Sequence, residues 1–158
     1  MKNNKGFSLV EIVIAIAIAT MFFLSIYELL LFANKVTHTG LRKIEAIHFA
    51  QEGIEAVRMV RDSGWTNNIS TLTDETTYYL SLVGDHWELT ALVPPLINSV
   101  FTRTVVLQAV NRDANDDISA IGTADLKTKK VVVGVSWQER GINHSVSLET
   151  YITNFLAN

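Results

Sequence analysis

The sequence has no cysteine and only two prolines among its 158 residues. The absence of cysteine excludes disulfides, thiolate nucleophiles and cysteine-ligated zinc, but it fits a cytoplasmic and an exported protein equally well. The 13 Lys and Arg residues are not gathered into a block, and the net charge is −3. The sequence therefore lacks the basic surface that a phosphate backbone requires, and we expect no nucleic-acid partner.

Catalytic and cofactor-binding motifs are also missing. The sequence contains no G-x-S-x-G, H-E-x-x-H, G-x-G-x-x-G or Walker-type pattern, and its four histidines lie in unrelated contexts. We therefore expect neither an enzyme active site nor a cofactor. The length is that of one modest domain.

The N-terminal segment carries most of the hydrophobicity. Residues 7–33 follow a short basic stretch and contain only two charges, Glu11 and Glu28. As a helix this segment would be about 40 Å long, which is sufficient to cross a hydrocarbon core of about 30 Å. A secretory signal peptide is disfavoured, because the apolar run is too long and its far end, Leu31-Phe32-Ala33, lacks the small residue two positions before Ala33.

Glu11 is an unusual residue for such a segment. A carboxylate costs about 2.5–3.5 kcal/mol at the middle of a bilayer, and less near its edge. Cleavage between Gly6 and Phe7 would create an amine four residues before Glu11, on the same helix face. Glu11 would then pair with that amine. The alternative is that Glu11 only stabilises the helix dipole from the first turn.

The sequence Lys5-Gly6-Phe7-Ser8-Leu9-Val10-Glu11, followed by a long apolar segment, resembles the leader of type IV prepilins and pseudopilins. The resemblance implies that a prepilin peptidase removes residues 1–6, cutting after Gly6, and methylates the Phe7 amine. It also implies that Glu11 docks each subunit against a neighbour's N-terminus. The loop charges leave the orientation open, whereas the resemblance places the leader in the cytoplasm and the C-terminal part in the periplasm or outside the cell.

The resemblance further implies a set of partners. These are the prepilin peptidase, other pilin or pseudopilin subunits bound through the N-terminal helix, an inner-membrane assembly platform, and membrane lipid before assembly. The apolar segment has no proline, since the two prolines are Pro94 and Pro95. Major pilins commonly carry a proline in this helix, so the chain is more similar to minor pilins and pseudopilins. The sequence of residues 50–55, AQEGIE, also resembles PilV-like minor pilins.

We therefore expect a minor type IV pilin, a structural subunit inserted into a pilus and affecting assembly or adhesion. A type II secretion pseudopilin is the alternative, because both proteins use the same leader and helix. The second alternative is a membrane-anchored periplasmic binding domain that does not polymerise. In that case the resemblance of the N-terminal motif would be a coincidence.

Residues 34–63 are expected to form an amphipathic helix. Its apolar side consists of Ala46, Ile47, Phe49, Ala50, Ile54, Val57 and Val60. Gly53 falls on the same side, where it would permit close approach to a sheet despite a helix penalty of about 1 kcal/mol. Ser63-Gly64 is expected to end the helix.

Residues 64–158 are expected to form a globular β domain. A loop from Trp65 to Thr77 would precede five strands. These are Tyr78–Val83, Trp87–Ala91, Phe101–Val110, Val131–Trp137 and His144–Phe155. The last two would form a hairpin with a turn at residues 139–143, and Trp137 would lie in the core. The predicted fold class is α+β and pilin-like, with one long N-terminal helix packed on a C-terminal antiparallel sheet.

Residues 111–128 form a polar stretch with several acidic residues. Asp113, Asn115 and Asp117 alternate as at the start of an EF-hand, but Ile118 and Ala124 replace the required Gly and Glu. An EF-hand is therefore excluded, and a turn rich in Asp and Asn is the default. Some pseudopilins bind calcium in a loop before the C-terminus, so the resemblance keeps one alternative open. That alternative is a calcium site formed by Asp113, Asp116, Asp117 or Asp125.

Overall fold

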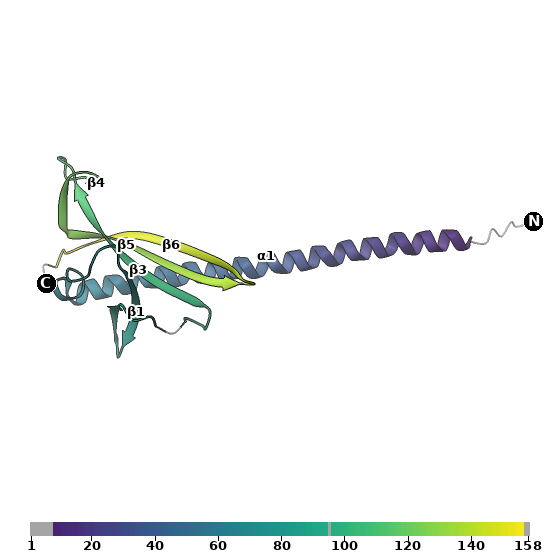
Figure 1. Cartoon of the computed structure of the whole chain (residues 1–158), viewed down its shortest axis with the longest axis horizontal. Helices are drawn as coiled ribbons and strands as arrows, with labels where there is room; N and C mark the ends of the chain where they lie inside the picture. Colours follow the sequence, from purple (N-terminus) through teal and green to yellow (C-terminus); the bar gives the residue numbers. More distant parts are fainter. Residues whose placement is uncertain (1–7, 95, 157–158) are drawn as a thin grey trace, which may run out of the picture. The chain divides into compact units, whose positions relative to one another are not determined.

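The computed structural model describes residues 8–94 and 96–156. One long helix, α1 (Leu9–Ser63), is followed by a short helix, α2 (Trp65–Asn68), and by a set of strands (Figure 1). The strands are β1 (Thr77–Val83), β2 (His86–Thr90), β3 (Phe101–Arg112), β4 (Ile118–Ser119), β5 (Thr123–Glu139) and β6 (Ile142–Thr153). The chain divides into two compact units, Met1–Arg42 and Lys43–Asn158, and each is described by itself.

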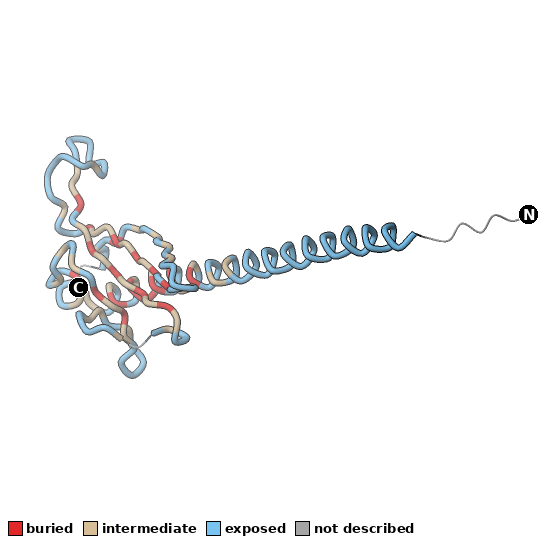
Figure 2. The backbone as a smooth tube through the Cα atoms, turned by 45° about the vertical axis from the view of Figure 1, so that its right-hand side comes forward, coloured by how far each residue is buried: buried red, intermediate tan, exposed pale blue. Residues whose placement is uncertain are grey.

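The described part of the first unit is a single exposed helix. Helix α1 has no proline to interrupt its hydrogen bonds. Every side chain from Ser8 to His38 is exposed (Figure 2). The N-terminal part of α1 is long and apolar enough to cross a membrane, and none of its most apolar stretch is buried within the protein. Each large apolar side chain would cost about 1.5–3 kcal/mol in water, so this helix needs lipid or another helix around it.

The second unit is an antiparallel sheet covered by the C-terminal part of α1. The strand order is β2-β1-β3-β5-β6, and β4 pairs with β3. Strands β3 and β5 alternate buried and less buried residues, because every second side chain points toward the helix. The buried helix residues are Ala46, Ala50, Gly53, Ala56, Val57 and Val60. The predicted α+β class is therefore confirmed. The predicted apolar side of the helix faces the core, and Phe49 and Ile54 on this side are partly buried against the core residues.

Helix and sheet are in close contact at Gly53. A Cβ atom at this position would lie 2.7 Å from Val133 Cγ1 and 2.9 Å from Arg103 Cδ. Arg103 is only 6% exposed. Its Nη1 donates to the Phe49 carbonyl oxygen at 3.1 Å and lies 3.3 Å from Glu52 Oε1. The buried guanidinium is therefore compensated by the helix backbone and by a carboxylate, as a buried charge must be.

The final hairpin agrees with the prediction in pairing and differs in its turn. Val131, Val133, Val135 and Trp137 are all buried and Trp137 is 6% exposed, which confirms the predicted core face. The turn, however, contains only Arg140 and Gly141, because Glu139 and Ile142 are already paired. Both turn residues have positive φ, 51° and 79°, as a two-residue turn requires when it follows the twist of the strands.

Two other local predictions were wrong. The segment after Gly64 was expected to be a loop, but residues Trp65–Asn68 form α2, and Trp65 is 4% exposed in the core. No strand was predicted within the polar stretch 111–128, but it contains the end of β3, all of β4 and the start of β5. The residues of β4 and of this part of β5 are mostly exposed, so they show no hydrophobic alternation that would reveal a strand.

Candidate functional site

The first candidate site is the start of α1. Ser8 precedes the helix, and its carbonyl oxygen accepts hydrogen bonds from the Glu11 N–H at 3.0 Å and the Ile12 N–H at 3.2 Å. Glu11 is thus in the first turn, and its side chain is exposed. Gly6 and Phe7, the predicted cleavage and methylation positions, lie outside the described residues.

Glu11 lies at one end of an open apolar depression on the helix surface. The depression has a volume of about 540 Å³ and is lined by Glu11, Ile12, Ala15, Ile16 and Ala19. The alanines follow Glu11 at intervals of four residues, so they share its side of the helix. Small residues in such a position permit a second helix to approach closely. The sequence shows that the segment is rich in alanine, but the helical structure aligns two of these alanines with the carboxylate.

Two hydroxyl groups of the apolar segment, those of Thr20 and Ser25, are satisfied within the helix. Thr20 Oγ1 donates to the Ala17 carbonyl at 2.8 Å, and Ser25 Oγ donates to the Met21 carbonyl at 2.9 Å. These bonds remove the need for water as a partner, which matters in lipid or in a helix bundle. The two carboxylates, Glu11 and Glu28, are therefore the side chains of residues 9–33 that most need a partner from elsewhere.

The aspartates of the predicted calcium alternative make different contacts from one another. Asp113 Oδ1 accepts the backbone N–H groups of Asn115 at 2.8 Å and Asp117 at 3.1 Å, which closes a turn. Asp125 Oδ2 accepts Arg112 Nε at 2.7 Å. Among residues 8–94 and 96–156, no three His, Asp or Glu side chains come together to hold a metal. The structure therefore does not gather the four aspartates into one site.

The pairing of Arg112 with Asp125 makes stability depend on pH. The Arg112 hydrogen bond, helped by Thr128 and the Lys127 backbone, lowers the pKa of Asp125 from 3.8 to about 2. A lowered pKa means that the stabilisation is complete above the unfolded value and is lost as the pH falls through the folded one. Replacement of Asp125 by Asn should therefore lower the free energy of unfolding by about 1 kcal/mol at pH 6, after allowance for solvent screening.

The comparison of wild type with Asp125→Asn at several pH values checks this expectation. The difference in free energy of unfolding between wild type and Asp125→Asn should shrink as the pH falls from 4 to 2, the range bounded by the unfolded and folded pKa values of Asp125. Asp116→Asn is the matched control, because the Asp116 side chain is 86% exposed and lies 3.6 Å from Arg112 Nε. If both variants lose the same free energy at pH 6, the pairing of Arg112 with Asp125 contributes nothing specific.

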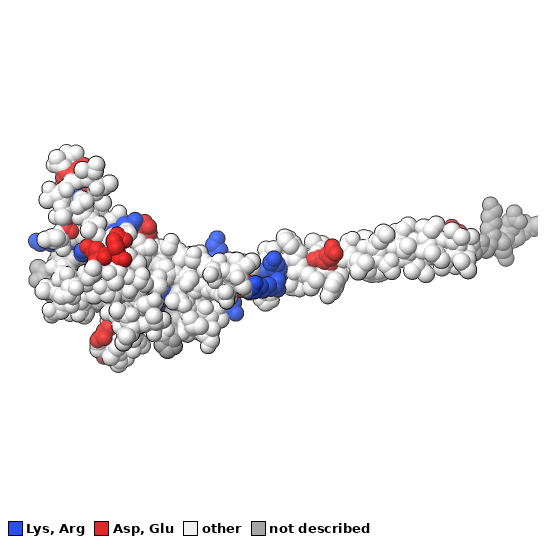
Figure 3. Space-filling model, viewed as in Figure 1, with Lys and Arg blue, Asp and Glu red and all other residues white. Residues whose placement is uncertain are grey.

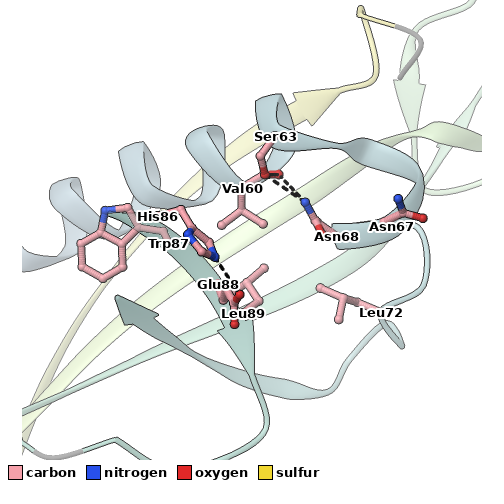
Figure 4. A pocket seen from close by; sticks show the side chains of 9 residues that line it. All are labelled: Val60, Ser63, Asn67, Asn68, Leu72, His86, Trp87, Glu88 and Leu89. Atoms are coloured by element: carbon pink, nitrogen blue, oxygen red, sulfur yellow. Dashed lines mark hydrogen bonds and ion pairs between the residues drawn. The ribbon is translucent and has the colours of Figure 1, made fainter. Parts of the chain in front are cut away.

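A second candidate site is a polar groove in the C-terminal unit (Figure 4). Its volume is about 460 Å³, and its lining consists of Val60, Ser63, Asn67, Asn68, Leu72, His86, Trp87, Glu88 and Leu89. Glu88 Oε1 accepts a hydrogen bond from His86 Nε2 at 2.9 Å, and this bond raises the pKa of His86. Ser63 Oγ donates to the Val60 carbonyl at 2.8 Å. Neither hydrogen bond joins Ser63 to His86, so the groove does not present them as a nucleophile and its base.

The comparisons with known proteins concern the first site. A family model described as the prokaryotic N-terminal methylation motif matches residues 1–27. The match includes Glu11 and the positions expected for cleavage and methylation. No curated protein and no solved structure gives a significant match to the chain.

Proposed function

We propose that this chain is a minor type IV pilin, a structural and not an enzymatic subunit that enters a pilus filament through α1. The prepilin methylation motif at residues 1–27 carries the proposal, and it supports a type IV pilin or a pseudopilin. Its presence implies processing by a prepilin peptidase and assembly with other pilin subunits. We place cleavage after Gly6, methylation on Phe7 and the docking contact at Glu11.

The exposed helix explains why such a subunit polymerises. Before assembly, lipid surrounds the apolar side chains of residues 9–33 of α1, all of which are exposed in the single chain. When the helix leaves the membrane, a bundle of parallel helices must replace the lipid, because water would cost about 1.5–3 kcal/mol for each large side chain. The subunit would first be a single-pass protein of the bacterial inner membrane, with its N-terminus in the cytoplasm. An assembly platform would then move it into the filament.

The absence of a proline favours a minor subunit over the main one. Helix α1 continues without interruption from Leu9 to Ser63, so it has no proline at which the helix would readily open during assembly. A type II secretion pseudopilin is the second candidate, since the same motif and the same uninterrupted helix suit it equally. Loss of exoprotein secretion with normal pili on deletion of the gene would favour the pseudopilin. Recovery of the chain with sheared pili would favour the minor pilin.

Leader processing tests the premise that the minor pilin and the pseudopilin share, namely that the N-terminus is a prepilin leader. The full chain is coexpressed with a prepilin peptidase, and the intact mass and N-terminal residue of the membrane-bound product are determined. We expect a product that begins at N-methylated Phe7 and lacks residues 1–6. Coexpression with a peptidase lacking its catalytic aspartates is the control, and it should leave Met1 in place. A chain that keeps Met1 beside a correctly processed control prepilin would contradict the proposal and favour the anchored domain that does not polymerise.

A further inference from the structure

The apolar N-terminal part of α1 has few charged residues, and its acidic residues outnumber its basic ones. Between residues 7 and 41 the acidic residues are Glu11 and Glu28, and the only Lys or Arg is Lys35. Figure 3 shows few charged side chains on the visible face of the N-terminal part of α1. Glu28 and Lys35 are both exposed, and neither makes an ion pair within the part of the chain that the structure describes.

The spacing of Glu28 and Lys35 prevents them from pairing along one helix. Seven residues separate them, which corresponds to about 10.5 Å along the helix axis and about 20° around it. They therefore lie on one stripe of the helix surface, together with Leu24 and Leu31. An ion pair requires a nitrogen and an oxygen within about 4 Å, so Glu28 and Lys35 cannot pair with each other within one copy.

We propose that, wherever two copies of this chain are neighbours in the filament, Glu28 of one copy pairs with Lys35 of the second, parallel copy, which is displaced along the helix axis. The inference rests on the proposed function, because only a bundle of such helices brings the two stripes together outside the lipid. Inside the bundle an unpaired carboxylate would face apolar neighbours, which is costly, and Lys35 is the nearest basic side chain along α1. The pairing thus gives the apolar helices a defined register, in the way that single polar residues fix register in coiled coils.

The direction of this displacement also agrees with the docking role proposed for Glu11. If the second copy is shifted toward its C-terminal end by about seven residues, its Glu28 reaches the level of Lys35 in the first copy. Its processed N-terminus, at sequence position 7, then lies about three residues beyond Glu11 of the first copy. A shift of four residues would bring the amine level with Glu11. Both pairings therefore require a displacement in the same direction, of about 6 Å for the amine with Glu11 and about 10.5 Å for Glu28 with Lys35.

Disulfide cross-linking in the full-length chain measures the displacement directly. The chain has no native cysteine, so introduced cysteines give no background. Two tagged copies are coexpressed with the prepilin peptidase and the assembly platform, one carrying Leu24→Cys and the other Leu31→Cys. We expect this staggered pair to cross-link about tenfold more than a pair in which both copies carry Leu24→Cys. Equal cross-linking of the two pairs would overturn the displacement.

Charge reversal tests the ion pair itself. Glu28→Lys and Lys35→Glu are each expected to reduce the Leu24–Leu31 cross-link about tenfold, and the double variant should restore it. Glu28→Leu is the second variant, since it makes the segment more apolar and favours insertion. A Glu28→Leu chain that assembles and cross-links as wild type would overturn the pairing. Leader processing is measured in every sample. An uncut leader would contradict both the proposed function and this inference. A normally cut leader without the staggered cross-link would contradict the inference alone.

Discussion

Replacement of Glu11 by Gln is expected to reduce incorporation into filaments about 100-fold while leaving leader removal intact. The Glu11 carboxylate lies beside Ile12, Ala15 and Ala19 in the depression that a second helix would cover. There it would compensate the N-terminal amine of a neighbouring subunit, and breaking a buried charge pair costs about 3–5 kcal/mol. Such a cost corresponds to a factor of 100 or more in an association constant.

The choice of Gln separates the docking role from a local role in the helix. Residues 8–11, Ser-Leu-Val-Glu, have the capping-box pattern, in which either Glu or Gln can occupy the last position. Glu11→Gln therefore keeps this local function and removes only the charge. The amount of the variant in sheared filaments, divided by the amount in membranes, is the quantity to measure.

Glu55→Gln is the matched control for this measurement. Glu55 also lies on α1, but its side chain is 59% exposed and is paired with Arg58 of the same helix. Its substitution should leave incorporation unchanged. Normal incorporation of Glu11→Gln would mean that the charge of Glu11 is not needed for docking.

The long helix and the buried faces of the sheet could be predicted because their signals are local. A continuous apolar run without proline, followed by a helical apolar stripe, identifies both parts of α1 from sequence alone. The alternation of Val131, Val133 and Val135 identifies the core face of β5 in the same way. In each case burial on one side dictates the residue type, so the pattern can be read without knowledge of the partner.

The start of β5 could not be predicted because its partner, and not its own pattern, makes it a strand. Thr123 and Asp125 pair with Arg112 and Val110, beyond a register shift at Ala109/Val110. The Arg112 side chain also binds Asp125. Both faces of this region are largely exposed, so burial imposes no alternation on its residues.

The candidate site shows the same division between local and distant information. Glu11 is identifiable from sequence, because a carboxylate in an apolar run requires an explanation. The alignment of Ala15 and Ala19 with Glu11 depends on the helix that contains them. By contrast, the close contact of Gly53 with Val133 and Arg103 involves residues from distant parts of the chain. The sequence placed Gly53 on the correct helix face, but it did not identify the side chains that meet it.

Substitutions of the two glycines of α1 by Ala are expected to have opposite effects on stability. A Cβ at Gly40 would meet no atom within 4 Å, so Ala there should stabilise the helix by up to about 1 kcal/mol. At Gly53 the same gain in helix stability is outweighed by steric overlap, because the new methyl group would lie 2.7 Å from Val133 Cγ1. Overpacking of this kind costs about 1–3 kcal/mol, and we expect Gly53→Ala to destabilise the C-terminal unit by up to about 2 kcal/mol.

Urea unfolding of the full chain in detergent gives the free energies of both variants. Tryptophan fluorescence follows Gly53→Ala, because the three tryptophans lie in the C-terminal unit, and far-UV circular dichroism follows Gly40→Ala. Val133→Ala identifies the contact, because it removes the Cγ1 atom that the new methyl group would meet. We expect the double variant Gly53→Ala/Val133→Ala to be about 1 kcal/mol more stable than the sum of the single changes predicts. Additive changes would place the strain elsewhere, at Arg103, whose Cδ lies 2.9 Å from the same position. A stable Gly53→Ala variant would instead mean that helix and sheet separate at little cost, and that close packing does not require glycine here.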